Sequence, residues 1–251
     1  MYPGGFGATL EETDPTQEGW SVLVVDLILG ALVALVCGLD RVAVLQIMIS
    51  RPIVAAPLAG WLLGDIEVGL QVGLMIELLW LARLPVGAAV PPDDTQVAIA
   101  GTVLSVALGK LLGLEGIEFI LLCLLVAIPF GKFGQFFDRF ARTRNRRTME
   151  RAEAALEAGN LSAAELYHLS GIAKFSMAAL GTYAVIVGGG VLLVPLLAPV
   201  LLSGLEHSAE WIRLALPVVG IAVVIGTINV NRSLTLFSAS FGMAFLLMWL
   251  V

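Results

Sequence analysis

Three carboxylates stand in or beside strongly apolar sequence. Glu77 interrupts the run LMIELLWL, and Asp93 and Asp94 close the stretch PVGAAVPPDD. At bilayer depth a bare carboxylate costs about 2.5–3.5 kcal/mol, so each must face a protein interior or a wet cavity and find hydrogen-bond partners. Such groups suit binding of a polar substrate or exchange of a proton. A purely structural alternative for Glu77 is an ion pair with Arg83, six residues later, that holds a kink.

The elements that position these carboxylates are expected to be membrane helices. Only 14% of the 251 residues are charged and the mean hydropathy is +0.95, which excludes an ordinary soluble domain. Because the apolar runs are continuous rather than alternating, strands are not expected. We therefore predict an all-α polytopic membrane protein with roughly 7–9 embedded segments, forming one membrane domain at 21–251 after a short disordered tail at 1–20. The candidate segments are 22–39, 42–63, 68–81, 97–112, 117–130, 172–202, 212–228 and 234–251.

Two stretches break the apolar pattern and predict broken helices. PVGAAVPPDD reads as the tip of a re-entrant hairpin, and IGTINVNRSL, with Asn229, interrupts the last long run. Irregular backbone is tolerated in a membrane only where it is buried or lines a wet cavity. Interruptions in both halves are typical of a transporter's midplane site and of inverted repeats. Glycines at 60, 64, 69 and 73 add a small-residue face on which helices can approach closely.

The basic residues of the chain are concentrated in its middle. Eight of the 14 Lys and Arg residues fall within 132–174, so the segment 132–171 is predicted to be cytoplasmic, between a first half at 21–131 and a second half at 172–251. Phe130, Phe133, Phe137 and Phe140 predict an interfacial helix with one aromatic face. A second, Ala/Glu-rich helix should end at Gly159, with Ser162 as the N-cap of the next. A soluble partner would dock on such a helix pair; the alternative is a solvated helical loop without function.

The glycine-spaced region resembles a known family. Its pattern is G-x-x-x-G-D-x-x-x-G, then glycine, glutamate and an IGAAVPPD-like turn, and it resembles the membrane subunit, enzyme IIC, of the mannose/fructose/sorbose branch of the bacterial phosphotransferase system (PTS). IPFGKFGQ and AGNLSAAELYHLS also resemble family stretches that flank its cytoplasmic segment. The residues that match are Gly60, Gly64, Asp65, Gly69, Gly73, Glu77, Gly87 with the three residues after it, Pro92 and Asp93.

The resemblance implies a division of labour between subunits. Enzyme IIC, with a IID membrane partner, binds a hexose outside and presents it inside the bacterial inner membrane, where phosphorylated IIB, supplied by IIA, transfers the phosphate. IIC then needs no catalytic residue, cofactor or metal, and no nucleic acid is involved; homo-oligomers are expected because the glycine-rich faces need partners. Carboxylates and amides bind sugar hydroxyls well. The sugar-binding candidates are Glu77, Asp93, Gln71 and Asn229, followed by Asp94 and Asp65. Asp65 and Asp93 are equally suited to cap the helices that follow them.

Other functions compete with this interpretation. An ion-coupled secondary transporter would use Glu77 and Asp93 as protonation sites. A non-transporting subunit would explain why Leu74, Met75 and Ile76 stand where the family has small or polar residues. A hydrolase or a metal centre is disfavoured, since His168 and His207 are the only histidines and no G-x-S-x-G occurs. Cys37 and Cys123 lie in separate apolar runs and are expected to be packing residues.

Overall fold

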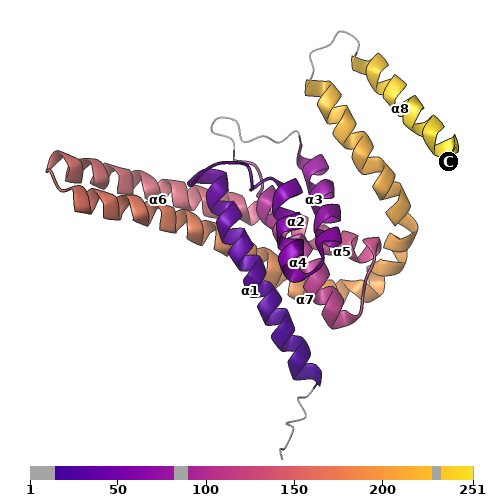
Figure 1. Ribbon diagram of the computed structural model, residues 1–251, viewed down its shortest axis with the longest axis horizontal. Coiled ribbons are helices and arrows are strands. Elements are labelled where there is room, and N and C mark those ends of the chain that lie inside the picture. The colour runs from indigo at the N-terminus through magenta and orange to yellow at the C-terminus, as the bar shows by residue number, and fades with distance from the viewer. Residues whose placement is uncertain (1–14, 82–89, 228–232, 251) are drawn as a thin grey trace, which may run out of the picture.

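The computed structural model describes residues 15–81, 90–227 and 233–250, and within these ranges every regular element is a helix (Figure 1). This confirms the all-α class. Arg83, Gly87 and Asn229 lie outside the described residues. The first helix begins at residue 15, inside the predicted tail. The helices are α1 (Pro15–Val42), α2 (Pro52–Leu63), α3 (Ile66–Trp80), α4 (Asp94–Leu112), α5 (Ile117–Phe130), α6 (Lys132–Glu157), α7 (Leu161–Thr227) and α8 (Ser233–Leu250).

Helix α4 is the centre of the molecule. Every residue from Thr95 to Gly109 is buried, because α1, α2, α3, α5 and α7 all pack against it. A largely apolar helix of this kind is typical of a buried position in a protein core or a membrane. The two ends of α4 therefore become the places where polar side chains from different helices meet.

Helices α2 and α3 form a tight hairpin that confirms the predicted small-residue face. Gly64, at φ 84°, ends α2, and Asp65 begins α3 by accepting a hydrogen bond from the Val68 amide (3.0 Å). A β-carbon on Gly69 would lie 2.6 Å from the carbonyl oxygen of Ala56, so only glycine permits this approach. With 12 and 15 residues, the helices are about 18 and 22 Å long, shorter than a bilayer core of about 30 Å.

Four helical stretches of the described residues are long and apolar enough to cross a membrane. They are Gly19–Val42, Asp94–Leu112, Ile117–Glu157 and Leu161–Ser208, and shorter apolar helices occur at Pro52–Leu63, Pro217–Gly226 and Thr235–Trp249.

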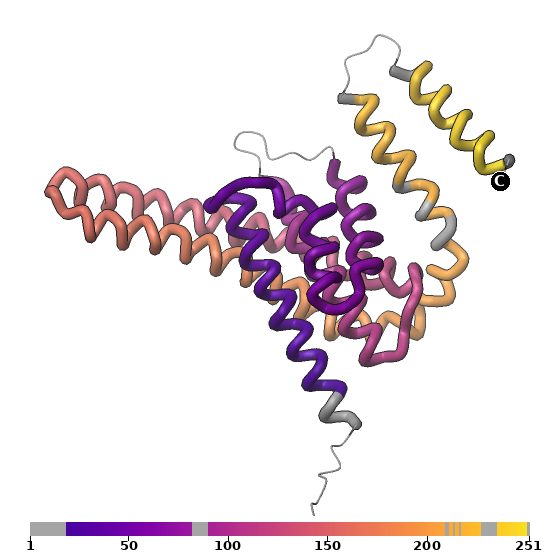
Figure 2. The backbone as a smooth tube through the Cα atoms, in the orientation of Figure 1, coloured from indigo at the N-terminus to yellow at the C-terminus, as the bar shows by residue number. Residues whose placement is uncertain are grey.

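The segments predicted at 172–202 and 212–228 are not separated by a break in the helix, because the 67-residue helix α7 runs through both as far as Thr227. A straight helix of that length would measure about 100 Å. Instead α7 curves strongly between the core and α8 (Figure 2). It contains Pro195, Pro199 and Pro217, and proline removes a helical hydrogen bond and is a common cause of bends.

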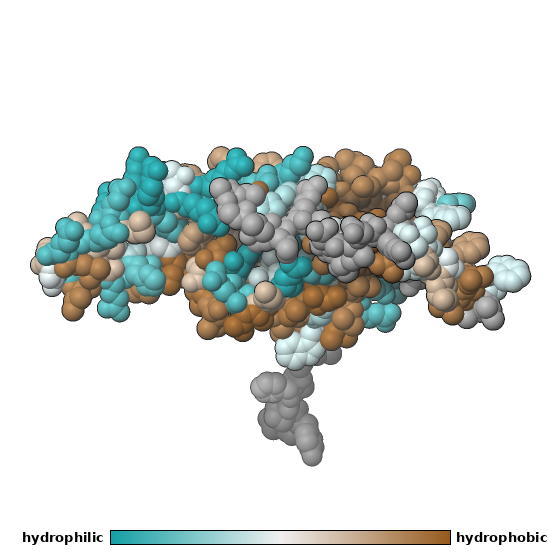
Figure 3. Space-filling view, turned by 90° about the horizontal axis from the view of Figure 1, so that it is seen from above, coloured by the Kyte–Doolittle hydropathy of each residue, from teal (hydrophilic) through white to brown (hydrophobic). Residues whose placement is uncertain are grey.

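The basic middle of the chain forms an arm, which we define as α6 and the first turns of α7, running side by side away from the core (Figure 1). Two predicted helices are one here, since α6 is continuous from Lys132 to Glu157. Gly159 (φ 73°) closes the connection as expected, but Asn160 rather than Ser162 caps α7, accepting from the Ala163 amide at 3.0 Å. Seen from above, hydrophilic residues gather along the arm beside hydrophobic ones (Figure 3). The predicted aromatic residues do not all lie on one outward face, because Phe137 packs toward Gly181 of α7.

Candidate functional site

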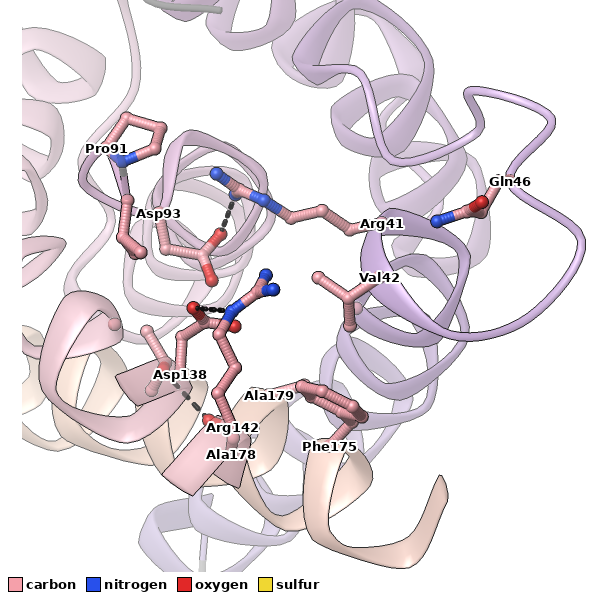
Figure 4. A pocket seen from close by; sticks show the side chains of 14 residues that line it. Arg41, Val42, Gln46, Pro91, Asp93, Asp138, Arg142, Phe175, Ala178 and Ala179 are labelled. Carbon is pink, nitrogen blue, oxygen red and sulfur yellow. Dashed lines mark hydrogen bonds and ion pairs between the residues drawn. The ribbon is translucent and has the colours of Figure 1, made fainter. Parts of the chain in front are cut away.

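A cavity of about 610 Å³ lies at the N-terminal end of α4, and we call it the Asp93 cavity. It is enclosed by the end of α1, the stretch before α4, the first turns of α6, and α7. Its charged side chains form two ion pairs that lie close together (Figure 4). The polar lining residues are Arg41, Gln46, Asp93, Asp138, Arg142 and Thr182.

Arg41 is the organising cation of this cavity. Its guanidinium donates to Asp93 at 2.5 Å, to Asp94 at 2.8 Å and to the Thr95 hydroxyl at 3.2 Å. Asp93 also accepts from the Gln96 amide at 3.0 Å, which confirms the predicted cap of α4. One carboxylate thus fixes the helix start and offers its remaining lone pairs to the cavity.

The second ion pair comes from the root of the arm. Arg142 donates to Asp138 at 2.6 Å, one helical turn apart on α6. Gly134 allows α6 to approach, because a β-carbon there would lie 2.5 Å from that of Asp93. The cavity and its surroundings hold two arginines against three aspartates, so hydrogen-bond donors and acceptors face each other without a large net charge.

A strained loop completes the cavity wall. Leu45, Gln46 and Met48 all have positive φ, which is uncommon for residues other than glycine. Asp40 holds this loop by accepting from the amides of Ile47 (2.8 Å) and Ser50 (3.0 Å). Strain of this kind persists only where the surroundings enforce it, and it clusters at functional sites.

Glu77 lies at the same end of the molecule but is already paired. The structure gives it Arg51 as its partner, whereas Arg83, the partner considered from the sequence, is outside the described residues. Gly69, Gly73 and Glu77 are spaced by four residues, so the carboxylate sits on the α3 face that packs against α2. There the carboxylate lies at the N-terminus of α2. The N-cap residue of α2, Arg51, makes no capping hydrogen bond with its side chain.

Thr95 connects this pair to the cavity. Its hydroxyl donates to the carbonyl oxygen of Ser50 at 2.7 Å and accepts from Arg41. Ser50 directly precedes Arg51 in the chain, so the Glu77 pair and the Asp93 cavity share one polar layer at this end of α4.

Asp65 and Gln71 lie elsewhere, in a second cavity of about 570 Å³ at the C-terminal end of α4. Asp65 caps α3, as anticipated, and Gln71 donates to Glu67 at 3.3 Å. Lys110 also lines this cavity, and it stands 17 positions after Asp93, which corresponds to about 25 Å along the helix. The predicted sugar-binding residues therefore do not form a single cluster.

Sequence reasoning missed Arg41, Asp138 and Arg142. A signal for Arg41 was present, since Asp40 and Arg41 are two charges at the end of the first long apolar run. Charges in that position are expensive unless they are paired, which marks them as candidates.

Comparison with known sequences decides the family. The sequence profile described as "PTS system sorbose-specific IIC component" matches residues 24–250. The chain belongs to this IIC family.

Named relatives of this IIC chain differ in their sugars. It is 28% identical over 151 residues to the mannose-specific EIIC component of Escherichia coli K12, covering 60% of the chain and 53% of the relative. To the fructose permease IIC component of Bacillus subtilis it is 28% identical over 148 residues, covering 59% and 50%. To the sorbose-specific EIIC component of Klebsiella pneumoniae it is 29% identical over 185 residues, covering 72% and 64%. The chain spans about half the length of the first two relatives.

Solved structures share the fold of this IIC chain. One, titled "Structure of membrane protein", matches with a TM-score of 0.65 and 26% identity, covering 88% of the chain and 86% of that structure. Another is the mannose transporter ManYZ in complex with microcin E492, with a TM-score of 0.55, 26% identity and the same coverage. Both support a membrane-protein fold for this chain.

Proposed function

We propose that this IIC chain binds a hexose-type sugar in the Asp93 cavity and translocates it across the bacterial cytoplasmic membrane. The observation that carries the proposal is the Asp93 carboxylate, which lines a cavity together with Arg41 in a member of the IIC family. The cavity volume of about 610 Å³ falls within the range of about 300–1,000 Å³ that small-molecule sites occupy.

The chemistry of the cavity suits a neutral polyol. A sugar hydroxyl donates to a carboxylate and accepts from a guanidinium, and hydrogen bonds with one charged partner are stronger than neutral ones. Arg41 and Arg142 are both paired with aspartates, so an anion in this cavity would have to displace a carboxylate from one of them. A hexose entering the cavity would exchange some of these contacts for its own hydroxyls.

Partners and orientation follow from the family resemblance and the distribution of charge. A IID subunit would complete the membrane assembly, homo-oligomers would cover the remaining apolar faces, and IIB phosphorylated by IIA would receive the sugar inside. The basic arm favours a cytoplasmic position for 132–171, which directs the Asp93 cavity inward and the second cavity outward. Labelling of a tag near Arg146 should occur only from the cytoplasmic side; labelling from outside intact cells would overturn this orientation.

A matched pair of substitutions tests the sugar site. Asparagine caps helices about as well as aspartate, so Asp93→Asn and Asp65→Asn keep their caps while each removes one carboxylate from one cavity. In equilibrium binding of a hexose panel to the purified chain with its IID partner, Asp93→Asn should weaken binding about tenfold or more. Asp65→Asn should bind like the wild type.

Weakened binding in Asp65→Asn, with wild-type binding in Asp93→Asn, would assign the sugar site to the second cavity. If the folded wild-type assembly binds no hexose, the proposed function is wrong, and the non-transporting interpretation replaces it. Thermal unfolding of each variant checks that the altered binding does not reflect an altered fold.

A further inference from the structure

A third cavity lies outside the site described above, between the two helices of the arm where they join the core. Its volume is about 570 Å³, and we call it the arm cleft. It receives Arg142, Asn145 and Arg146 from α6, and Tyr167 and His168 from α7. Met149, Ile172 and Phe175 supply apolar surface.

The arm cleft combines an apolar wall with a basic edge. None of the described residues that line it is acidic, and Arg146 takes part in no ion pair among the described residues. Lys174 adds a further cation at its edge by donating to the Thr148 hydroxyl. Arginine guanidinium groups match the geometry of phosphate oxygens, so a phosphate group is the anion that best suits this edge.

One buried acceptor in the cleft wall needs a different partner. The amide nitrogen of Asn145 donates to the carbonyl oxygen of Gly171 at 3.1 Å, but its Oδ1 atom is buried and has no hydrogen-bond partner in the described residues. A buried unpaired acceptor is destabilising by about 1–3 kcal/mol in general. The phosphate of an ionised ester carries no proton and cannot donate to this oxygen, whereas a hydroxyl on the esterified group can.

We propose that the arm cleft binds a phosphate ester carried on a hydroxyl-bearing group. The phosphate lies on Arg146 and Arg142, and a hydroxyl donates to Oδ1 of Asn145. Two sources share this chemistry: the headgroup of an anionic, hydroxylated phospholipid, and a soluble hexose phosphate. The second source rests on the proposed function, which would release hexose phosphate on the same side of the membrane.

The position of the cleft connects it to the sugar site. Arg142 and Phe175 line both the arm cleft and the Asp93 cavity, and the Arg142 guanidinium lies 6.0 Å from the centre of the Phe175 ring. A phosphate in the cleft would therefore compete with Asp138 for Arg142, and so would alter the wall of the sugar cavity.

Calorimetric titration of the purified full chain in phosphatidylcholine nanodiscs tests the proposal. The probes are glucose 6-phosphate and dihexanoylphosphatidylglycerol, with glucose and inorganic phosphate for comparison. Arg146→Gln should weaken binding of the esters about tenfold or more. Arg151→Gln, which removes the same charge from the same helix outside the cleft, should change it by less than about twofold because a distant exposed charge is screened. Asn145→Ala should also weaken binding of the hydroxylated esters.

Each outcome of these titrations has a defined meaning. Saturable binding of glucose 6-phosphate alone identifies the soluble source, binding of the lipid alone identifies the headgroup, and binding of both assigns the shared chemistry to both. No saturable binding of either ester, or equal losses in Arg146→Gln and Arg151→Gln, overturns the proposal. Asp93→Asn separates it from the proposed function, since this variant should lose hexose binding and keep ester binding.

Discussion

Replacing Gly69 by alanine should destabilise the protein through one steric contact. The new β-carbon would lie 2.6 Å from the carbonyl oxygen of Ala56 and 2.9 Å from the Cα atom of Pro57, and both are backbone atoms of α2. Ordinary contact begins at about 3.4 Å, so the two helices must separate by roughly 0.8 Å. Helix α2 cannot retreat freely, because Ala55 and Ala56 are fully buried.

Two opposing effects set the magnitude. Alanine in place of glycine favours a helix by about 1 kcal/mol. Overpacking a well-packed site costs about 1–3 kcal/mol, and contact with rigid backbone belongs at the upper end. The steric effect wins, and the free energy of unfolding should fall by about 1–2 kcal/mol.

Gly188→Ala is the matched control that isolates the effect of replacing glycine by alanine on helix propensity. Gly188 lies in α7, and a β-carbon there would have no neighbour within 4 Å. The free energy of unfolding of this variant should therefore equal that of the wild type or exceed it by up to about 1 kcal/mol. Reversible denaturant unfolding of the purified chain in one detergent, followed by helical circular dichroism, measures both. If Gly69→Ala proved as stable as Gly188→Ala, the close approach of α2 and α3 would not be the reason for glycine at position 69.

Two further changes test other contacts. Lys110 donates to Asp26 and to the last carbonyl of α2, both at 3.0 Å, and Asp26 is buried, so Lys110→Met should destabilise by about 1–3 kcal/mol. Adding Asp26→Leu should restore most of the loss in the same unfolding assay. A larger defect in the double variant would contradict this account. Asn160→Ala should destabilise the arm by about 1 kcal/mol, measured by hydrogen exchange at its tip, whereas Ser162→Ala should have little effect. A larger loss in Ser162→Ala would show that Ser162 is the cap.

Features determined by near neighbours in the chain were predictable from the sequence. The glycine face of the α2–α3 hairpin follows from the spacing of Gly60, Gly69 and Gly73, which brings small residues to one side of each helix. The caps by Asp65 and Asp93 also follow, because an aspartate before a helix reaches an amide three residues later.

Errors arose where helix continuity was in question. The aromatic and Ala/Glu-rich parts of α6 differ in composition, but no glycine or proline separates them after Gly134, so nothing ends the helix. In α7, the apolar runs 172–202 and 212–228 were predicted as separate segments. One helix continues through both, and its three prolines bend it without ending it.

The candidate site was only partly predictable because ion pairs join distant parts of the chain. Burial requires that Asp93 and Glu77 be paired, but the sequence does not reveal that their partners are Arg41 and Arg51, 52 and 26 residues away. The grouping of Asp65 with Asp93 failed for a geometric reason that the hairpin makes plain. Asp65 stands at the turn between α2 and α3, and α3 then runs for about 18 Å before it reaches Glu77. Residues of one sequence motif, such as Asp65 and Glu77, therefore lie at opposite ends of α4.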